Sequence, residues 1–370
     1  MNIVAFRRHL HAHPELSFRE QATAAFISAQ LAAAGIAHRP VAATGILARI
    51  KGRIPCDDRR AVVLRADIDA LPIAEQTGLP YASQQPGIMH ACGHDMHAAV
   101  LYGVLLRLAA APDFCGTVFG LFQPGEECNP GGASLVLAEN PFEGFDVRAV
   151  IGEHVEPQLE VGALGFRAGK YMAASDELRF RVLGTGGHAA LRSQLKDPVA
   201  ASAGLVAALL ALNTPERVLS IGRIDAAGAT NVIPDEVRLE GTLRTFDEAD
   251  RTAVHRRIAE LAADIDSRHG VHTEVDISHG YPAVVNDPEL TRLAVARAAA
   301  MGLRTEMLPL RTTAEDFGFY SQRYPALFYR LGVGRAAGRP HTALFAPDER
   351  ALDAGAEFMR TLALQILDKQ

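Results

Sequence analysis

The stretch HDMHAAVLYGVLLRLAAAPDFCGTVFGLFQPGEE, residues 94–127, joins a helical pattern to a short apolar run. Residues 94–111 are predicted to be a helix, and residues 117–123 are typical of a strand buried in a sheet covered on both faces. Residues 60–69 and 147–152 have a similar texture and are predicted strands. This alternation of strands and helices predicts an α/β fold with a mixed, mostly parallel sheet.

A second pattern begins near residue 172. The strands expected at 177–184, 217–225, 236–246 and 271–278 alternate with helices expected at 197–213 and 247–270. Their order, β-α-β-β-α-β, is the split unit of ferredoxin-like α+β domains. After residue 280 the α/β pattern returns. We therefore predict a discontinuous catalytic domain, 1–171 and 280–370, interrupted by a satellite domain at 172–279 that serves as a lid or dimerisation element.

Length and composition exclude several classes of protein. The chain has 370 residues, of which 48% are hydrophobic and 22% charged, with a net charge of −6. Without a Lys/Arg run, this balance argues against nucleic acid or an anionic membrane as the main partner. No signal peptide or membrane span is visible, and four cysteines fit a reducing compartment. The expectation is a soluble cytoplasmic protein. The cysteines are Cys56, Cys92, Cys115 and Cys128.

Metal-binding side chains follow several predicted strands. They occur in MHACGHDMH (89–97), QPGEE (123–127), GEHVEP (152–157) and GRPHTALF (338–345). In open α/β sheets, ligands bind outside the carboxyl ends of the strands, so these turns are expected to converge on one crevice. The pair Glu126 and Glu127 follows a buried strand, where two carboxylates need cations nearby. Cys92 lies just before a helix, a position that favours the thiolate, which suits a borderline-soft divalent metal.

Nine motifs, in order along the chain, carry a family resemblance. Three of them are MHACGHDMH, QPGEE and PHTALF, which occur in the segments above. The other six are RRHLHAHPELSFRE (7–20), RADIDALPI (65–73), GTGGHAA (184–190), TNVIPDE (230–236), GTLRTF (241–246) and AEDFGFY (314–320). Together they resemble the M20 metallopeptidase family, in particular its amidohydrolase branch of hippurate hydrolases, N-acyl amino acid amidohydrolases and auxin-conjugate hydrolases. The resemblance spans nearly the whole chain.

The resemblance implies a dinuclear centre holding two divalent metals. Mn is the ion that it favours, while Zn, Co and Ni tolerate the same mixed ligands. Glu126 matches the general base, and Asp69 matches a carboxylate that orients a ligand. His97 is interpreted as a packing or supporting residue, and the histidines at 9, 11 and 13 as structural. The implied ligands are Cys92, His94, Glu127, His154 and His341.

The resemblance also implies roles for the satellite domain. His188 matches a histidine that, in dimers of the family, reaches the partner's active site and stabilises the oxyanion. Asn231 and Arg244 match groups near the substrate carboxylate, and Arg244 offers a planar fork suited to it. Leu191 and Arg192 stand where many members have Pro-His. The resemblance therefore does not define the geometry of the loop after His188. A homodimer through the satellite domain is expected.

The leading functional hypothesis is hydrolysis of N-acyl amino acids to a carboxylic acid and a free amino acid. Two cations would activate a water, and Glu126 would carry its proton to the leaving amine. One alternative is a dipeptidase or aminopeptidase on the same centre. A more distant alternative is a non-catalytic metal-binding or small-molecule-binding homologue, which the complete set of base and ligands argues against.

Overall fold

The computed structural model describes residues 1–56 and 59–368, and its residues separate into two compact units. The first unit comprises Met1–Tyr171, Val285–Leu310 and Asp316–Gln370, and the second comprises Met172–Val284 with Arg311–Glu315. The inserted satellite domain was expected at 172–279. In the described part of the chain, no helix is both long and apolar enough to span a membrane.

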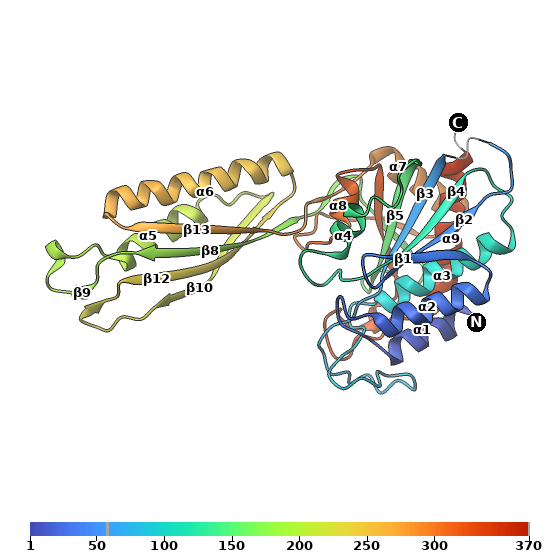
Figure 1. Cartoon of the computed structure of the whole chain (residues 1–370), viewed down its shortest axis with the longest axis horizontal. Helices are drawn as coiled ribbons and strands as arrows, with labels where there is room; N and C mark the ends of the chain where they lie inside the picture. The colour runs from blue at the N-terminus through green and yellow to red at the C-terminus, as the bar shows by residue number, and fades with distance from the viewer. Residues whose placement is uncertain (57–58, 369–370) are drawn as a thin grey trace. The chain divides into compact units, whose positions relative to one another are not determined.

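The first unit is built on an eight-stranded mixed sheet (Figure 1). Four neighbouring pairs are parallel, namely β3 with β4, β3 with β5, β5 with β16 and β6 with β15. The antiparallel β1 and β2 extend one edge of the sheet. In spatial order the strands are β1 (Ala37–Val41), β2 (Gly45–Lys51), β4 (Thr117–Gln123), β3 (Arg60–Asp67), β5 (Asp146–Glu156), β16 (Ala326–Gly332), β6 (Leu164–Phe166) and β15 (Thr305–Met307).

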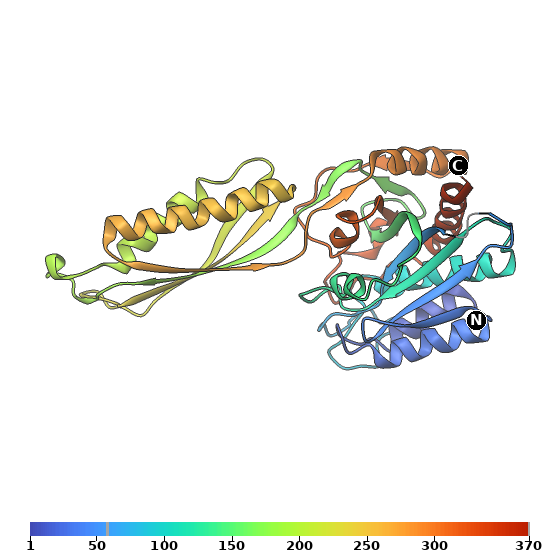
Figure 2. The same cartoon turned by 45° about the horizontal axis from the view of Figure 1, so that its top comes forward.

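Helices cover both faces of this sheet (Figure 2). On one face α3 packs against β3, and it also contacts α1 and α9. On the other face α4 packs on β4 and α8 packs on β16. All seven residues of β4 are buried, as expected for an apolar strand between two helical layers. The helices of this unit are α1 (Ile3–Ala12), α2 (Gln21–Ala33), α3 (His94–Ala110), α4 (Gly132–Ala138), α7 (Pro288–Ala300), α8 (Gly318–Ser321) and α9 (Ala351–Asp368).

The second unit has the predicted ferredoxin-like order. Its antiparallel sheet runs β10 (Arg217–Ala226), β12 (Glu236–Thr245), β8 (Ala174–Leu183), β13 (His272–His279). Helices α5 (Pro198–Leu210) and α6 (Glu248–His269) lie on one face, over a core that includes Leu178, Phe180 and Val182. The intervening residues Arg179 and Arg181 are exposed, because successive strand side chains point to opposite faces. One short pair, β9 (Gly187–His188) with β11 (Val232–Ile233), also belongs to this unit. Another, β7 (Gly169–Met172) with β14 (Val284–Asn286), lies where the chain passes from one unit to the other.

The structure corrects the interpretation of the cysteines. Cys56 and Cys115 form a disulfide that joins the segments preceding β3 and β4, across 59 residues of sequence. These segments lie at the amino ends of two adjacent parallel strands. The expectation of a reducing compartment had left all four cysteines unpaired, and only Cys92 and Cys128 are free. The pairing follows from strand adjacency, which spacing along the chain does not reveal.

Candidate metal centre

The candidate site begins at the first turn of α3. Gly93 adopts a left-handed conformation with φ of 96°, and a Cβ there would lie 2.6 Å from the side chain of Val155. Only glycine fits both the backbone angle and the close packing. This turn places Cys92 and His94, both buried, on the side of the sheet where β5 ends.

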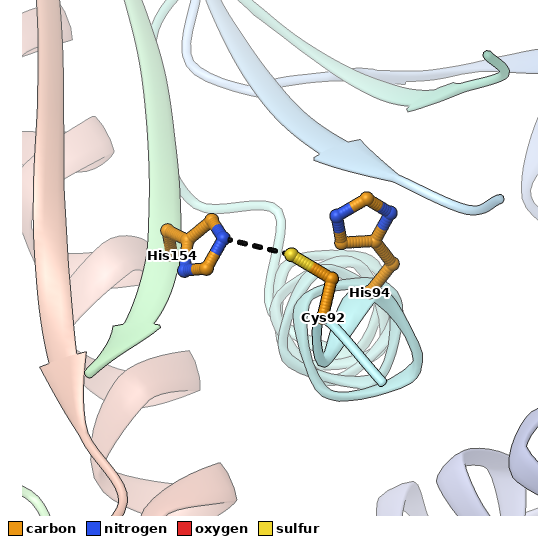
Figure 3. A group of neighbouring side chains, drawn as sticks. All are labelled: Cys92, His94 and His154. Carbon is orange, nitrogen blue, oxygen red and sulfur yellow. Dashed lines mark hydrogen bonds between the residues drawn. The ribbon is translucent and has the colours of Figure 1, made fainter. Parts of the chain in front are cut away.

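Two groups of donor atoms share the Cys92 thiol. In the first group, Sγ of Cys92 lies 3.3 Å from Nε2 of His154 on β5, with His94 close by (Figure 3). The second group combines Cys92 with Glu127 and His341. Nε2 of His341 lies 3.3 Å from the thiol and 3.3 Å from a carboxylate oxygen of Glu127. All five predicted ligands therefore come together, and the thiol stands where it could bridge two cations.

The backbone has a positive φ at two points of the site, and it is strained at the first of them, His341. His341 has φ of 60°, in the left-handed region that side chains other than Gly, Asn and Asp rarely adopt. Gly125 has φ of 62°, and a Cβ there would lie 2.4 Å from the ring of Phe18. The turn before Glu126 therefore has no room for a larger residue.

Glu126 lies beside the donor groups. Its side chain is 7% exposed, and its carboxylate falls within one cluster with His94 and Glu127, in which the donor atoms are within 4.8 Å of one another. The carboxylate is thus close enough to exchange a proton with a molecule held at the donors, which is the geometry that a general base requires.

Asp69 orients two parts of the site at once. Its Oδ1 lies 3.1 Å from Nδ1 of His94, which leaves Nε2 of that ring facing the donor cluster. Its Oδ2 accepts hydrogen bonds from the hydroxyl of Ser17 at 2.7 Å and from the backbone N–H of Glu127 at 2.9 Å. Although burial opposes ionisation, the His94 hydrogen bond lowers the pKa of Asp69. Asp69 therefore fixes the orientation of the His94 ring.

Behind the donors lies a fully buried ion-pair network. Arg65 on β3 donates to Asp67 and Asp316, each at 2.6 Å, and to Gln123 at 2.9 Å. His97 joins this network through Nδ1, 2.6 Å from Asp67, while its Nε2 accepts the backbone N–H of Val155 at 2.9 Å. Both ring nitrogens are occupied, so His97 supports the site rather than offering a ligand atom, in agreement with the sequence interpretation.

The electrostatics of the donor set fit cations. Burial and the neighbouring Glu127 carboxylate raise the pKa of the Cys92 thiol, contrary to the expectation that the helix start favours the thiolate. Hydrogen bonds to Cys92 and Glu127 raise the pKa of His341 to about 10. Nε2 of His94 is buried and has no hydrogen-bond partner among residues 1–56 and 59–368. Thiol, imidazole and carboxylate donors of this kind are a suitable set for a divalent transition metal.

The predicted satellite residues lie in the second unit. His188 on β9 and Asn231 are neighbours, since the backbone N–H of Ala189 donates to the Asn231 carbonyl at 2.9 Å. Nδ1 of His188 accepts the Ala190 N–H at 3.2 Å, so its proton lies on Nε2. Arg244 on β12 stands apart from this pair. Its Nη1 is buried with no hydrogen-bond partner in the described chain, and burial lowers the pKa of this guanidinium.

Sequence reasoning missed two supporting residues of the site, Ser17 and Arg65. Both lie inside motifs that were singled out, RRHLHAHPELSFRE and RADIDALPI, so the motif was visible but the role was not. A buried-strand pattern interrupted by Arg65 was the available signal, because an arginine inside an apolar strand requires buried carboxylates as partners.

Comparison with known proteins places this geometry in a family. The sequence model of peptidase family M20/M25/M40 matches residues 63–365. An N-acetyl-L-cysteine deacetylase of Bacillus subtilis is 39% identical, over 99% of this chain and 88% of its own. An N-acyl-L-amino acid amidohydrolase of Geobacillus stearothermophilus is 40% identical over 78% of this chain and 79% of its own.

A solved structure agrees with these relatives. The dinuclear metal binding peptidase of the M20 family from Bacillus subtilis superposes with a TM-score of 0.89 and 35% identity, covering 100% of this chain and 98% of its own. Both the sequence and the fold therefore match along the whole chain. The chain belongs to peptidase family M20/M25/M40 and is a metal-dependent hydrolase of its amidohydrolase branch.

Proposed function

We propose that this enzyme hydrolyses the amide bond of N-acyl amino acids, either N-acetylated or hippurate-like, with Glu126 as the general base. The observation that carries the proposal is the position of Glu126 beside two donor groups that share one thiol. The deacetylase and amidohydrolase relatives support an acylated amino acid as the substrate class.

The proposed ligands of the two divalent ions are those of the two donor groups. Cys92 would be shared, with His94 and His154 on one side and Glu127 and His341 on the other. When bound, such ions polarise the acyl carbonyl and lower the pKa of a water from 15.7 toward ~7. Mn is the proposed metal, with Zn, Co and Ni as alternatives for the same donor set.

Glu126 would move one proton through the reaction. Its carboxylate takes a proton from the attacking water while the new bond forms between the water oxygen and the acyl carbon. The same carboxyl group then gives that proton to the amide nitrogen as the carbon–nitrogen bond breaks. The products are a carboxylic acid and a free amino acid. Asp69 contributes by holding His94 and the backbone of Glu127.

Residues of the second unit would act on the substrate. His188, with its proton on Nε2, would donate a hydrogen bond to the developing oxyanion. Arg244 would bind the substrate carboxylate, and its unpartnered Nη1 supports that role. Asn231, which lies beside His188 and apart from Arg244, would reach the same carboxylate from the partner subunit. Arg244→Lys should raise KM about tenfold with a smaller change in kcat, because a bidentate fork is lost. An unchanged KM would remove Arg244 from the substrate site.

The enzyme is further proposed to be a cytoplasmic homodimer acting on small molecules, with His188 reaching the partner's site. Sedimentation at micromolar concentration tests the dimer, and a monomer there would exclude action in trans. Mixing inactive Glu126→Gln subunits with inactive His188→Ala subunits tests it further. Activity recovered in the mixed dimer supports a shared site, whereas no recovery contradicts it.

The decisive experiment tests the substrate class, the metal requirement and the general base together. Protein stripped with a chelator is supplied with Mn²⁺ or Zn²⁺ and offered N-acetyl amino acids, hippurate, an indole-acyl amino acid and several dipeptides. Metal-restored cleavage of an acyl amino acid should fall about 10²–10⁴-fold in Glu126→Gln, as expected for loss of a general base. Glu143→Gln, the same change at an exposed position, is the matched control and should be unaffected.

Three outcomes would change this proposal. Preference for dipeptides over acyl amino acids would favour the dipeptidase or aminopeptidase alternative. Two equivalents of bound metal with no turnover of any substrate in the panel would favour a non-catalytic binding protein. Full activity in Glu126→Gln would assign the base to another residue.

A further inference from the structure

The N-terminal helix makes a buried contact with the first turn of α3. Arg7 and His11 are four residues apart on α1, and both are fully buried, which is unusual for charged side chains. Nε of Arg7 lies 2.6 Å from Oδ2 of Asp95, and Nδ1 of His11 lies 2.9 Å from the same oxygen. Asp95 is the second residue of α3 and directly follows the ligand His94.

Two more carboxylates, those of Glu75 and Glu349, contact His11 and Arg7. Nε2 of His11 lies 3.2 Å from Glu75, and Glu75 also accepts the backbone N–H of Ser83 at 2.6 Å. Arg7 also donates to Glu349 at 3.2 Å. The buried positive and negative groups therefore compensate one another, which is the condition under which charges remain inside a protein.

The start of α3 needs such support from outside the helix. Its N-cap, Gly93, has no side chain to accept a hydrogen bond from the exposed N–H groups of the first turn. The first turn nevertheless carries His94 and follows Cys92 by two residues, so its position decides where two donor atoms lie.

The same N-terminal segment supports the site at a second point. Ser17 donates to Asp69, which orients His94, and the backbone N–H of Ala70 donates to the Glu15 carbonyl at 2.8 Å. Residues 7–17 therefore contact both the start of the helix that carries His94 and the carboxylate that aligns the His94 ring. This segment precedes residue 63, where the match to the broad family model begins.

We propose that Arg7 and His11 are positioning residues for the metal centre, which hold the first turn of α3 through Asp95 so that Cys92 and His94 face the cations. The proposal rests on the ligand set of the proposed function but on none of its substrate assignments. It assigns a role to the histidine motif at 9–13 that the sequence analysis treated as structural. Only His11 of that motif contacts Asp95; His9 stacks on Phe26 instead.

Two substitutions of His11 separate positioning from packing. His11→Asn keeps a nitrogen at the place of Nδ1 and so retains the donor to Asp95. His11→Gln places its nitrogen near Nε2, which retains the contact with Glu75 and loses the one with Asp95. His9→Gln is the matched control on the same helix. Each variant of the full chain is stripped of metal and titrated with Mn²⁺ and Zn²⁺ by calorimetry, and its unfolding by denaturant is followed in parallel.

We expect His11→Gln to weaken binding of the metals about tenfold or more, the usual cost of removing a group that orients ligands. His11→Asn and His9→Gln should keep the affinity of the unsubstituted protein. Activity of His11→Gln at limiting Mn²⁺ should fall in proportion and recover at saturating Mn²⁺.

Equal metal affinity in His11→Gln and His9→Gln would overturn the proposal, even if His11→Gln unfolds more easily. Equal losses in His11→Asn and His11→Gln would also overturn it, because the contact with Asp95 would then not be what matters. Normal metal binding by the unsubstituted protein without any hydrolysis would refute the proposed function alone and leave this test intact.

Discussion

The charged pairs behind the donor cluster of the first unit differ from those on the open sheet face of the second unit. In the first unit, Arg65 and its partners Asp67 and Asp316 are fully buried behind the donor cluster. In the second unit, the open face of the sheet carries exposed ion pairs, such as Arg181 with Glu236 and Glu274, and Arg181 is 47% exposed. Buried pairs are tolerated only when each charge is fully compensated, whereas exposed pairs are nearly neutral for stability.

This difference separates a unit that must hold atoms in place from one that presents a solvated surface. The charges of the first unit hold His97, His94 and the first turn of α3. The second unit also contains a buried pair, Asp176 with Arg251. Buried charges in this protein therefore occur where side chains and helix starts are held in place.

The largest effect is expected from Arg65→Met. This change leaves Asp67 and Asp316 buried without their shared cation, and breaking a buried pair in this way costs about 3–5 kcal/mol. Unfolding of the metal-free protein by urea measures the loss. A loss below about 1 kcal/mol would mean that the network contributes no more than surface pairs do, which would break the comparison.

An intermediate effect is expected from Cys56→Ser. The disulfide closes a loop of 59 residues, and a cross-link of that size stabilises by about 2–4 kcal/mol by restricting the unfolded chain. Unfolding of the oxidised protein and of the variant measures the difference, and a thiol count should find two free thiols in the oxidised protein. Four reactive thiols in protein purified without reductant would contradict the pairing.

The smallest effect is expected from Arg181→Met, the same substitution on the open face of the second unit. Its two partners stay hydrated when the guanidinium is removed, so the cost should be within about 0–1 kcal/mol. The urea experiment used for Arg65→Met gives a direct comparison. A loss as large as that of Arg65→Met would show that the exposed face is covered in solution, for example by a second copy of the chain.

Much of the site was predictable because several of its donors lie near the carboxyl ends of strands or just after them. His154 lies within β5, and Glu126 and Glu127 come just after β4; parallel strands bring their carboxyl ends to one edge whatever their separation in sequence. The strands themselves were visible as apolar runs, and the satellite unit as alternation. These signals are local, so a single sequence carries them.

The pairings that support the site were not predictable in the same way. Arg65 meets Asp316 across 251 residues, and His11 meets Asp95 across 84. A buried arginine predicts that a carboxylate lies next to it. Which carboxylate this is depends on the order of the strands and on how α1 packs on α3. The room available at Gly125 and the pairing of Cys56 with Cys115 likewise depend on neighbours far along the chain.

The sequence by itself thus determined the fold class, the inserted unit and the identity of the candidate donor residues, because periodicity, strand ends and family motifs are properties of short segments. Only the tertiary structure decided that Cys92 is common to two donor groups, that both nitrogens of His97 are occupied, and that α1 braces the start of α3. These are contacts between segments distant in sequence, and packing in three dimensions selects one partner among several that the sequence allows.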